Sequence, residues 1–84
     1  MDLTYFQGKK IALIGFGIEN ISVARFLLKH NIDFEIRDQA PIKKLLAEGQ
    51  KLIESKNLKV ETGKDYLSNI NKFDIIIRSP EFLI

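Results

Sequence analysis

A glycine-rich segment, residues 15–20 (Gly-Phe-Gly-Ile-Glu-Asn), has the residue types and spacing of a phosphate-binding loop. It follows an apolar run and opens a segment with helical spacing, which is the context that such a loop requires. The first glycine permits a tight turn, the second lets the backbone approach phosphates, and the free N–H groups of the following helix attract an anion. The pattern predicts nucleotide binding, with candidate contacts at Gly15, Gly17, Ile18, Glu19 and Asn20.

An acidic residue lies where a second contact is expected. Asp38 follows Gly15 by 23 residues, close to the spacing of roughly 20 residues at which an acid binds a ribose hydroxyl. It could instead cap a helix that begins at Pro41. Two loop residues depart from the dinucleotide pattern. Asn20 occupies the third glycine position, so the helix must stand further from the sheet or Asn20 must cap it. Glu19 carries a carboxylate where phosphate would dock, so it either fills the anion site or repels phosphate.

The elements that would position these residues alternate between strand and helix. The patterns predict strands at 10–14, 33–37, 58–62 and 73–78, and helices at 18–30, 41–55 and near 66–70. Asn31 is expected to close the first helix in a left-handed conformation. This order predicts an α/β, Rossmann-like three-layer sandwich with a parallel sheet of about four strands. The chain stops six residues past the last strand. We therefore expect residues 1–84 to be one nucleotide-binding domain of a longer multidomain enzyme, truncated before a final helix and strand.

Composition narrows the class of protein. The 84 residues include no cysteine and one histidine, which argues against disulfides and a metal site and fits a cytoplasmic protein. No apolar run approaches the roughly 20 residues that span a bilayer, so no membrane partner is expected. The net charge is only +2, and the lysines near Glu48 and Glu54 are mixed with acids. That pattern predicts a solvated helix face and no nucleic-acid partner.

Four segments carry a family resemblance. They are the opening from Gln7 to Gly17 followed by Ser22, then Asp38, then Thr62-Gly63, and finally residues 74–80 (Asp-Ile-Ile-Ile-Arg-Ser-Pro). The last is similar to a family segment, D-x-hydrophobic-x-x-S-P-G. Together they resemble the Mur ligases, especially the type that adds D-glutamate to UDP-N-acetylmuramoyl-L-alanine. The resemblance covers nearly the whole chain, and the order and spacing of the segments are more specific than any single motif.

The resemblance implies a function that this chain would share with other domains. An amino-terminal domain would bind the UDP-linked muramoyl substrate, and a central ATPase and a carboxyl-terminal domain would follow. With ATP and Mg, the later domains would phosphorylate the substrate carboxylate, and the amine of the amino acid would attack the acyl phosphate to form an amide. The product would serve peptidoglycan and cell-wall synthesis, and hence cell shape and division. This chain has no G-x-x-x-x-G-K-[ST] motif, so the fragment alone is expected to be inactive.

By position, the resemblance also implies roles for single residues. Ile18 and Glu19 would lie against the pyrophosphate, and Asp38 and Gln39 near uracil or ribose. The pocket would be closed by Ser79, Pro80 and Glu81. The family often has Asp-Thr-Arg where this chain has Asp-Gln-Ala at 38–40, and Ser-Pro-Gly where it has Ser-Pro-Glu at 79–81. A cation and a glycine are therefore missing from the expected site.

Other interpretations of the same residues remain open. A nicotinamide-binding domain of a dehydrogenase, or a ligand-sensing regulatory module, would use the glycine loop and Asp38 equally well. The glycines could also shape only a tight turn, or nucleotide binding could have been lost, with Glu19 in the anion site. Arg78 could meet a phosphate or pair with Asp74 or Asp38. No catalytic residue is predicted, because Ser22 has no histidine base in its motif.

Overall fold

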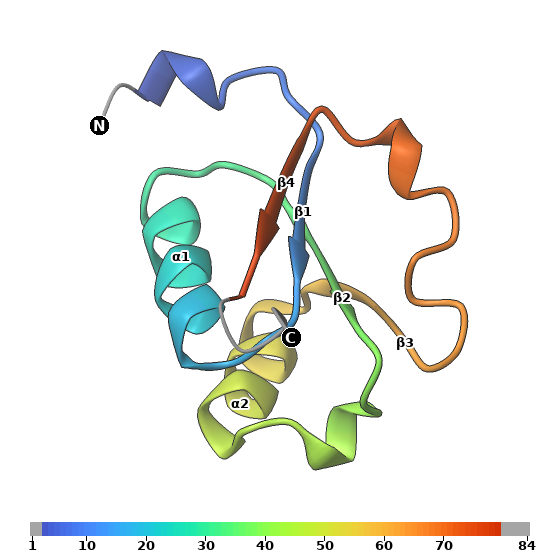
Figure 1. The fold of residues 1–84 in the computed structure, drawn as a ribbon. Coiled ribbons are helices and arrows are strands. Elements are labelled where there is room, and N and C mark those ends of the chain that lie inside the picture. The colour runs from blue at the N-terminus through green and yellow to red at the C-terminus, as the bar shows by residue number, and fades with distance from the viewer. Residues whose placement is uncertain (1–2, 80–84) are drawn as a thin grey trace.

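The computed structural model describes residues 3–79 of the 84-residue chain. Within them, four strands alternate with two α-helices: β1 (Ile11–Ile14), α1 (Ile18–Lys29), β2 (Glu35–Asp38), α2 (Ala47–Lys56), β3 (Lys59–Thr62) and β4 (Ile75–Arg78). Short 3-10 turns lie at Leu3–Tyr5, Ile42–Lys44 and Ile70–Lys72. The strands form one parallel sheet in the order β3-β2-β1-β4 (Figure 1). The predicted α/β, Rossmann-like fold with four parallel strands is confirmed.

One face of the sheet carries the apolar core. The strand register aligns Leu13 with Ile36 and Ile77, and Ile36 with Val60, so these side chains share a face. Both connections that contain α-helices step in the same direction across the sheet, so right-handed crossovers place α1 and α2 on that same face. Figure 1 shows the two helices together on one side and the segment from 63 to 74 crossing elsewhere. On the opposite face of the sheet, β1 is also shielded from solvent, since Ala12 is fully buried.

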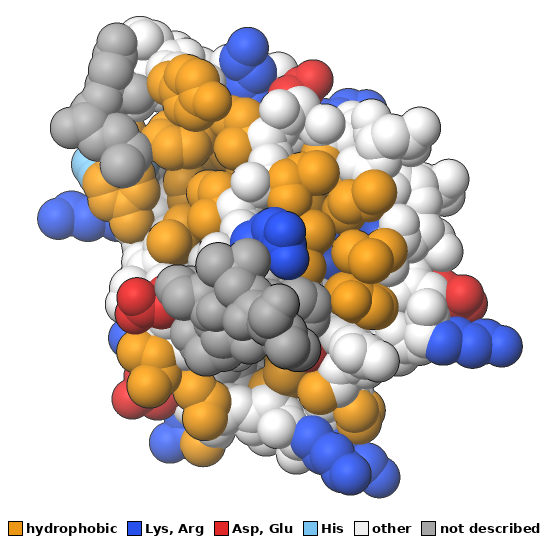
Figure 2. All heavy atoms as spheres, in the orientation of Figure 1, with side chains coloured by type: hydrophobic (Ala, Val, Ile, Leu, Met, Phe, Trp, Pro, Cys, Tyr) orange, Lys and Arg blue, Asp and Glu red, His pale blue; other side chains and the backbone are white. Residues whose placement is uncertain are grey.

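The β4 edge of the sheet is less covered than its centre. All four residues of β1 are buried, whereas in β4 half-buried and exposed residues alternate. Ile76 is 43% exposed. Figure 2 shows hydrophobic side chains gathered over the middle of this view, while most lysines and arginines project from its margin. The basic side chains on this face therefore form no continuous stripe of the kind that nucleic-acid binding requires.

Both helices end in the same way. Asn31, with φ 58°, follows α1 in the left-handed conformation that the sequence predicts, and Asn57, with φ 51°, does the same after α2. The N–H groups of Ile32 and Leu58 then donate to carbonyls near each helix end, at 2.9 and 3.0 Å. These caps turn the chain directly into β2 and β3. In the described part of the chain, no helix is long and apolar enough to cross a membrane.

The predicted second helix is wrong in its first half. Instead of running from Pro41 to about Ser55, the chain makes a 3-10 turn, becomes extended at Leu45, and enters α2 only at Ala47. The extended backbone buries the Leu45 side chain in the core. In a continuous helix the Leu45 carbonyl would accept a backbone N–H. Here it accepts a hydrogen bond from Gln50 Nε2 at 2.7 Å instead.

The predicted short helix near residues 66–70 is also wrong. This segment forms consecutive turns, followed by the 3-10 turn from Ile70. The cause is Arg37, whose Nη1 donates to the carbonyls of Tyr66 and Ser68 at 3.0 and 2.7 Å. The buried guanidinium binds these two carbonyls, and Asn69 is in the left-handed conformation with φ 57°, so the segment does not continue as an α-helix.

Candidate nucleotide-binding site

The sheet brings the predicted site residues together at its carboxyl edge. The Gly15 N–H donates to the Arg37 carbonyl at 2.7 Å, and the Ser79 N–H donates to the Ile14 carbonyl at 2.9 Å. The glycine loop therefore lies between the ends of β2 and β4, with Asp38 on one side and Ser79 on the other. In open parallel sheets, ligands bind at this edge, where the strand order reverses. Here the reversal falls at β1.

The glycine loop presents backbone donors. Gly15 has φ +85°, a left-handed conformation that side chains disfavour. Gly17 precedes α1 without a side-chain cap, and its carbonyl accepts the first helical bond from the Ile21 N–H at 2.9 Å. Within residues 3–79, no acceptor pairs with the backbone N–H of Ile18 or Glu19. The start of this 12-residue helix can therefore bind an anion through its free N–H groups and its dipole.

Asn20 has a structural role that differs from the predicted cap. Its side chain is 1% exposed, and Nδ2 donates to the carbonyls of Ile14, Gly15 and Ile77 at 3.1, 2.7 and 3.3 Å. The cap interpretation is wrong, because Gly17 takes the N-cap position. The buried Asn20 amide instead connects the start of α1 to β1, the glycine loop and β4 by hydrogen bonds. A third glycine at this position would only have allowed the helix to approach the sheet closely.

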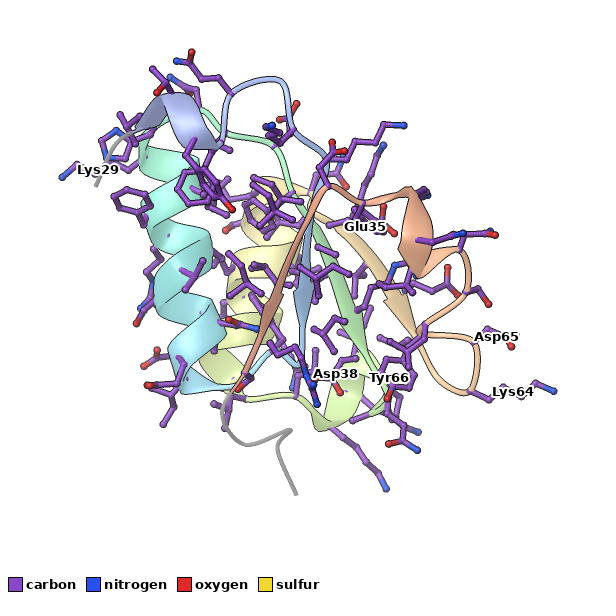
Figure 3. All side chains as sticks on the ribbon, turned by 45° about the horizontal axis from the view of Figure 1, so that its top comes forward. Lys29, Glu35, Asp38, Lys64, Asp65 and Tyr66 are labelled. Atoms are coloured by element: carbon purple, nitrogen blue, oxygen red, sulfur yellow. The ribbon has the colours of Figure 1, made fainter. Side chains whose placement is uncertain are left out.

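Asp38 holds the glycine loop from the end of β2. It is 7% exposed; Oδ2 accepts from the Phe16 N–H at 2.7 Å and Oδ1 from the Ala40 N–H at 2.8 Å. Figure 3 shows its side chain at the carboxyl end of β2. The interpretation as a cap at Pro41 is wrong, since that turn has no side-chain cap. An ionised carboxylate has about four acceptor positions, so Asp38 retains capacity for a ligand hydroxyl.

The helix-start side chains face solvent. Ile18 is 69% exposed, and Glu19 is exposed as well. Gln39, which follows β2, is also exposed. Glu19 makes no hydrogen bond or ion pair in the part of the chain that the structure describes. Its carboxylate therefore does not fill the anion position in this structure, although it adds negative charge beside that position.

Ser79 closes the other side of the loop. The residue is 1% exposed, and its Oγ has no hydrogen-bond partner among the described residues. A buried hydroxyl without a partner costs about 1–3 kcal/mol, which a ligand or a water could offset. Pro80 and Glu81, predicted to close the pocket beside it, lie outside the described residues.

Two arginines near this edge have different surroundings. Arg37 is buried and pairs with Glu35 at 2.7 Å, a role that the sequence analysis missed. The sequence could have predicted this pair, because Glu35 and Arg37 have opposite charges and lie two residues apart in a strand. That spacing places both side chains on the same face of the sheet. Arg78 is exposed and forms no ion pair within residues 3–79, so the predicted pairing with Asp74 or Asp38 is wrong. Asp74 instead accepts from the Lys10 N–H at 2.8 Å.

Comparison with known proteins gives one consistent result. The chain is 30% identical over 80 residues to the UDP-N-acetylmuramoylalanine–D-glutamate ligase of Clostridium novyi (strain NT), covering 95% of this chain. It is 33% identical over 76 residues, 89% of this chain, to the ligase of the same name from Limosilactobacillus reuteri (strain DSM 20016). The chain spans about 17% and 16% of the lengths of these curated relatives, and it resembles their amino-terminal portion. No protein-family model matches the chain. No solved structure matches it either.

Proposed function

We propose that this chain is the UDP-substrate-binding, amino-terminal domain of an ATP-dependent amide ligase of peptidoglycan precursor synthesis. Its substrate would be UDP-N-acetylmuramoyl-L-alanine, and the amino acid added would be D-glutamate. One observation carries the proposal: a glycine loop lies between Asp38 and the buried Ser79 hydroxyl, and neither that hydroxyl nor the N–H groups at the start of α1 have a partner within residues 3–79. The similarity to D-glutamate ligases over 95% of the chain supplies the choice of ligand.

The available donors and acceptors match the parts of a UDP group. The pyrophosphate would lie on the N–H groups of Ile18 and Glu19, where the helix dipole favours an anion. A ribose hydroxyl or the uracil would use the remaining acceptor positions of Asp38, beside the exposed Gln39. The Ser79 hydroxyl would gain a hydrogen-bond partner when the ligand binds.

The bond-forming chemistry would belong to other domains of a longer protein. In the proposed reaction, the substrate carboxylate is phosphorylated by ATP, and the amine of D-glutamate displaces phosphate to form the amide. The ATP and Mg sites would lie in a central ATPase, because the 84 residues contain no G-x-x-x-x-G-K-[ST] motif. This domain would contribute only binding and orientation of the nucleotide end of the substrate.

A titration of the 15N-labelled chain with UDP, and separately with NAD, tests the proposal. We expect UDP to shift the backbone amide resonances of residues 15–20, 38 and 79, and NAD to leave them in place. Shifts with NAD alone would identify a dinucleotide-binding module instead. No resonance shift with either ligand would contradict nucleotide binding by this chain.

Two variants test the details of the site. Ser79→Ala removes a buried hydroxyl without a partner among residues 3–79, so it should raise folding stability by up to about 1–3 kcal/mol but weaken UDP binding roughly fivefold, the equivalent of one hydrogen bond. Ser55→Ala is the matched control, because its exposed hydroxyl lies on α2. Glu19→Ala should strengthen UDP binding by removing a like charge. Equal UDP affinity in all three variants and the parent chain would rule out the proposed contacts.

A further inference from the structure

A cavity lies at the opposite edge of the sheet from the glycine loop. Its volume is about 610 Å³, within the range of small-molecule sites. It is lined by the segments that lead into the strands, by the last turns of α1 and α2, and by the residues just before β4. Because those segments lie at the amino ends of the strands, this cavity is separate from the proposed UDP site.

Part of the cavity wall is apolar. Ile11 is 1% exposed, and the half-buried side chains that complete this part of the lining are Leu28, Ile32, Phe34, Leu58 and Phe73. Most of them also pack against the hydrophobic core. A ligand that fills this space would therefore bury an aliphatic or aromatic body, with a gain of about 25 cal/mol for each Å² of apolar surface removed from water.

The cavity also carries an excess of positive charge. Two acids and five lysines line it, the lysines being Lys9, Lys10, Lys56, Lys59 and Lys72. Glu35, one of the acids, already pairs with the buried Arg37 at 2.7 Å. None of the five lysines takes part in an ion pair within residues 3–79. The lysine ammonium groups therefore remain available to a ligand.

The helix ends that reach the cavity do not cancel this charge. Each helix C-terminus carries roughly half a negative charge from its unpaired carbonyls. The N–H groups of Ile32 and Leu58 already donate to carbonyls at these two ends. Two half charges and one free acid, Asp33, are outweighed by five ammonium groups. The balance favours an anionic ligand.

We propose that this cavity is a second binding site, for a small organic anion with an apolar or aromatic body. The anionic group would lie among Lys59, Lys72 and the other lysines, and the body would rest on Phe34 and Phe73. Lys72 is already close to the Phe73 ring, with Nζ 5.3 Å from the ring centroid, so a cation and an aromatic surface are adjacent at one point of the wall.

The probe for the experiment is 8-anilinonaphthalene-1-sulfonate, an aromatic anion whose fluorescence rises on binding. It would be titrated into the 84-residue chain and into two double variants. Lys59→Gln with Lys72→Gln removes two cavity ammonium groups, and Lys43→Gln with Lys44→Gln removes two exposed ones outside the cavity. Each cavity ammonium should contribute about fivefold to affinity, since opposite charges about 4 Å apart attract by about 1 kcal/mol in water. We therefore expect roughly 25-fold weaker binding for the first pair and unchanged binding for the second.

Two further measurements distinguish this site from non-specific binding to a loosened core. N-phenyl-1-naphthylamine, the uncharged analogue, should bind at least tenfold more weakly than the sulfonate. Amide resonances of residues 10, 33, 59 and 73 should shift with the sulfonate, whereas those of residues 15–20 should not. Equal losses in both double variants, equal affinity for the two probes, or shifts at the glycine loop would each overturn the proposal.

Discussion

The change Asp38→Asn tests whether this acid builds the glycine loop. The carboxylate is 7% exposed and accepts backbone N–H groups at 2.7 and 2.8 Å, one from Phe16 in the loop and one from Ala40. An asparagine side chain has a single oxygen acceptor. Its NH₂ group would therefore face one of the two N–H donors, and that donor would lose its partner in a buried position.

The expected cost follows from these two bonds. A hydrogen bond to a charged group contributes about 1.5–3 kcal/mol. Losing one bond outright and the charge assistance of the other should destabilise the chain by about 2–4 kcal/mol. For a domain of 60–100 residues, 1 kcal/mol shifts Tm by roughly 4–8 °C. Asp38→Asn should therefore lower Tm by at least about 8 °C, measured by circular dichroism without any ligand.

Asp65→Asn is the matched control. Asp65 is exposed in the turn after β3, and its carboxylate makes no hydrogen bond to the described residues. The same loss of charge there should change the unfolding free energy by less than about 0.5 kcal/mol. If Asp38→Asn were equally harmless while UDP binding fell, Asp38 would be a ligand contact only. That result would show that the Asp38 carboxylate does not stabilise the glycine loop.

Three other substitutions test the supports of the site. Asn20→Asp should destabilise the chain by several kcal/mol in urea unfolding, since a buried carboxylate would face three carbonyl oxygens; unchanged stability would contradict the fastening role. Arg37→Lys should cost about 2 kcal/mol and speed amide hydrogen exchange in the 63–69 turn, because lysine cannot reproduce the guanidinium contacts. In Gly49→Ala, the new Cβ would lie 3.0 Å from Phe16 Cδ2. The helix-propensity gain of about 1 kcal/mol should then be cancelled, and the Phe16 amide resonance should move; a simple gain in Tm with no such movement would show that the ring yields freely.

The parts of the fold that the sequence predicted are those set by local pattern. The run ending at Ile14 is apolar at every position, and all of β1 is buried on both faces. Asn31 tolerates the left-handed conformation and closes α1 where the periodicity stops. Gly15 and Gly17 lie between a strand and a helix, as the sequence predicts. The backbone conformation of such a turn depends mainly on residues adjacent in the chain. Such features need no knowledge of tertiary contacts.

Two of the features that the sequence did not predict arise where a side chain bonds to backbone far away in the sequence. Arg37 reaches carbonyls 29 and 31 residues ahead and prevents the helix predicted near 66–70. Asp38 reaches back 22 residues to the Phe16 N–H. Helical or strand periodicity cannot report a hydrogen bond of this kind, which competes with the local pattern by satisfying the same backbone groups. The identity of Asp38 as a site residue was predictable, but its bond to the loop was not.

This division bears on how the site would recognise a ligand. The two polar side chains nearest the loop, Asp38 and Asn20, are already engaged with backbone. The phosphates would therefore be bound by the N–H groups of Ile18 and Glu19. These groups respond to the charge and shape of a phosphate and do not distinguish one base from another. Next to them Glu19 adds a negative charge, and the exposed Arg78 of β4 pairs in register with Ile14 at the end of β1. In the proposed site, nucleotide affinity should therefore be modest, and selectivity for uridine should depend on the remaining acceptor positions of Asp38 and on Gln39.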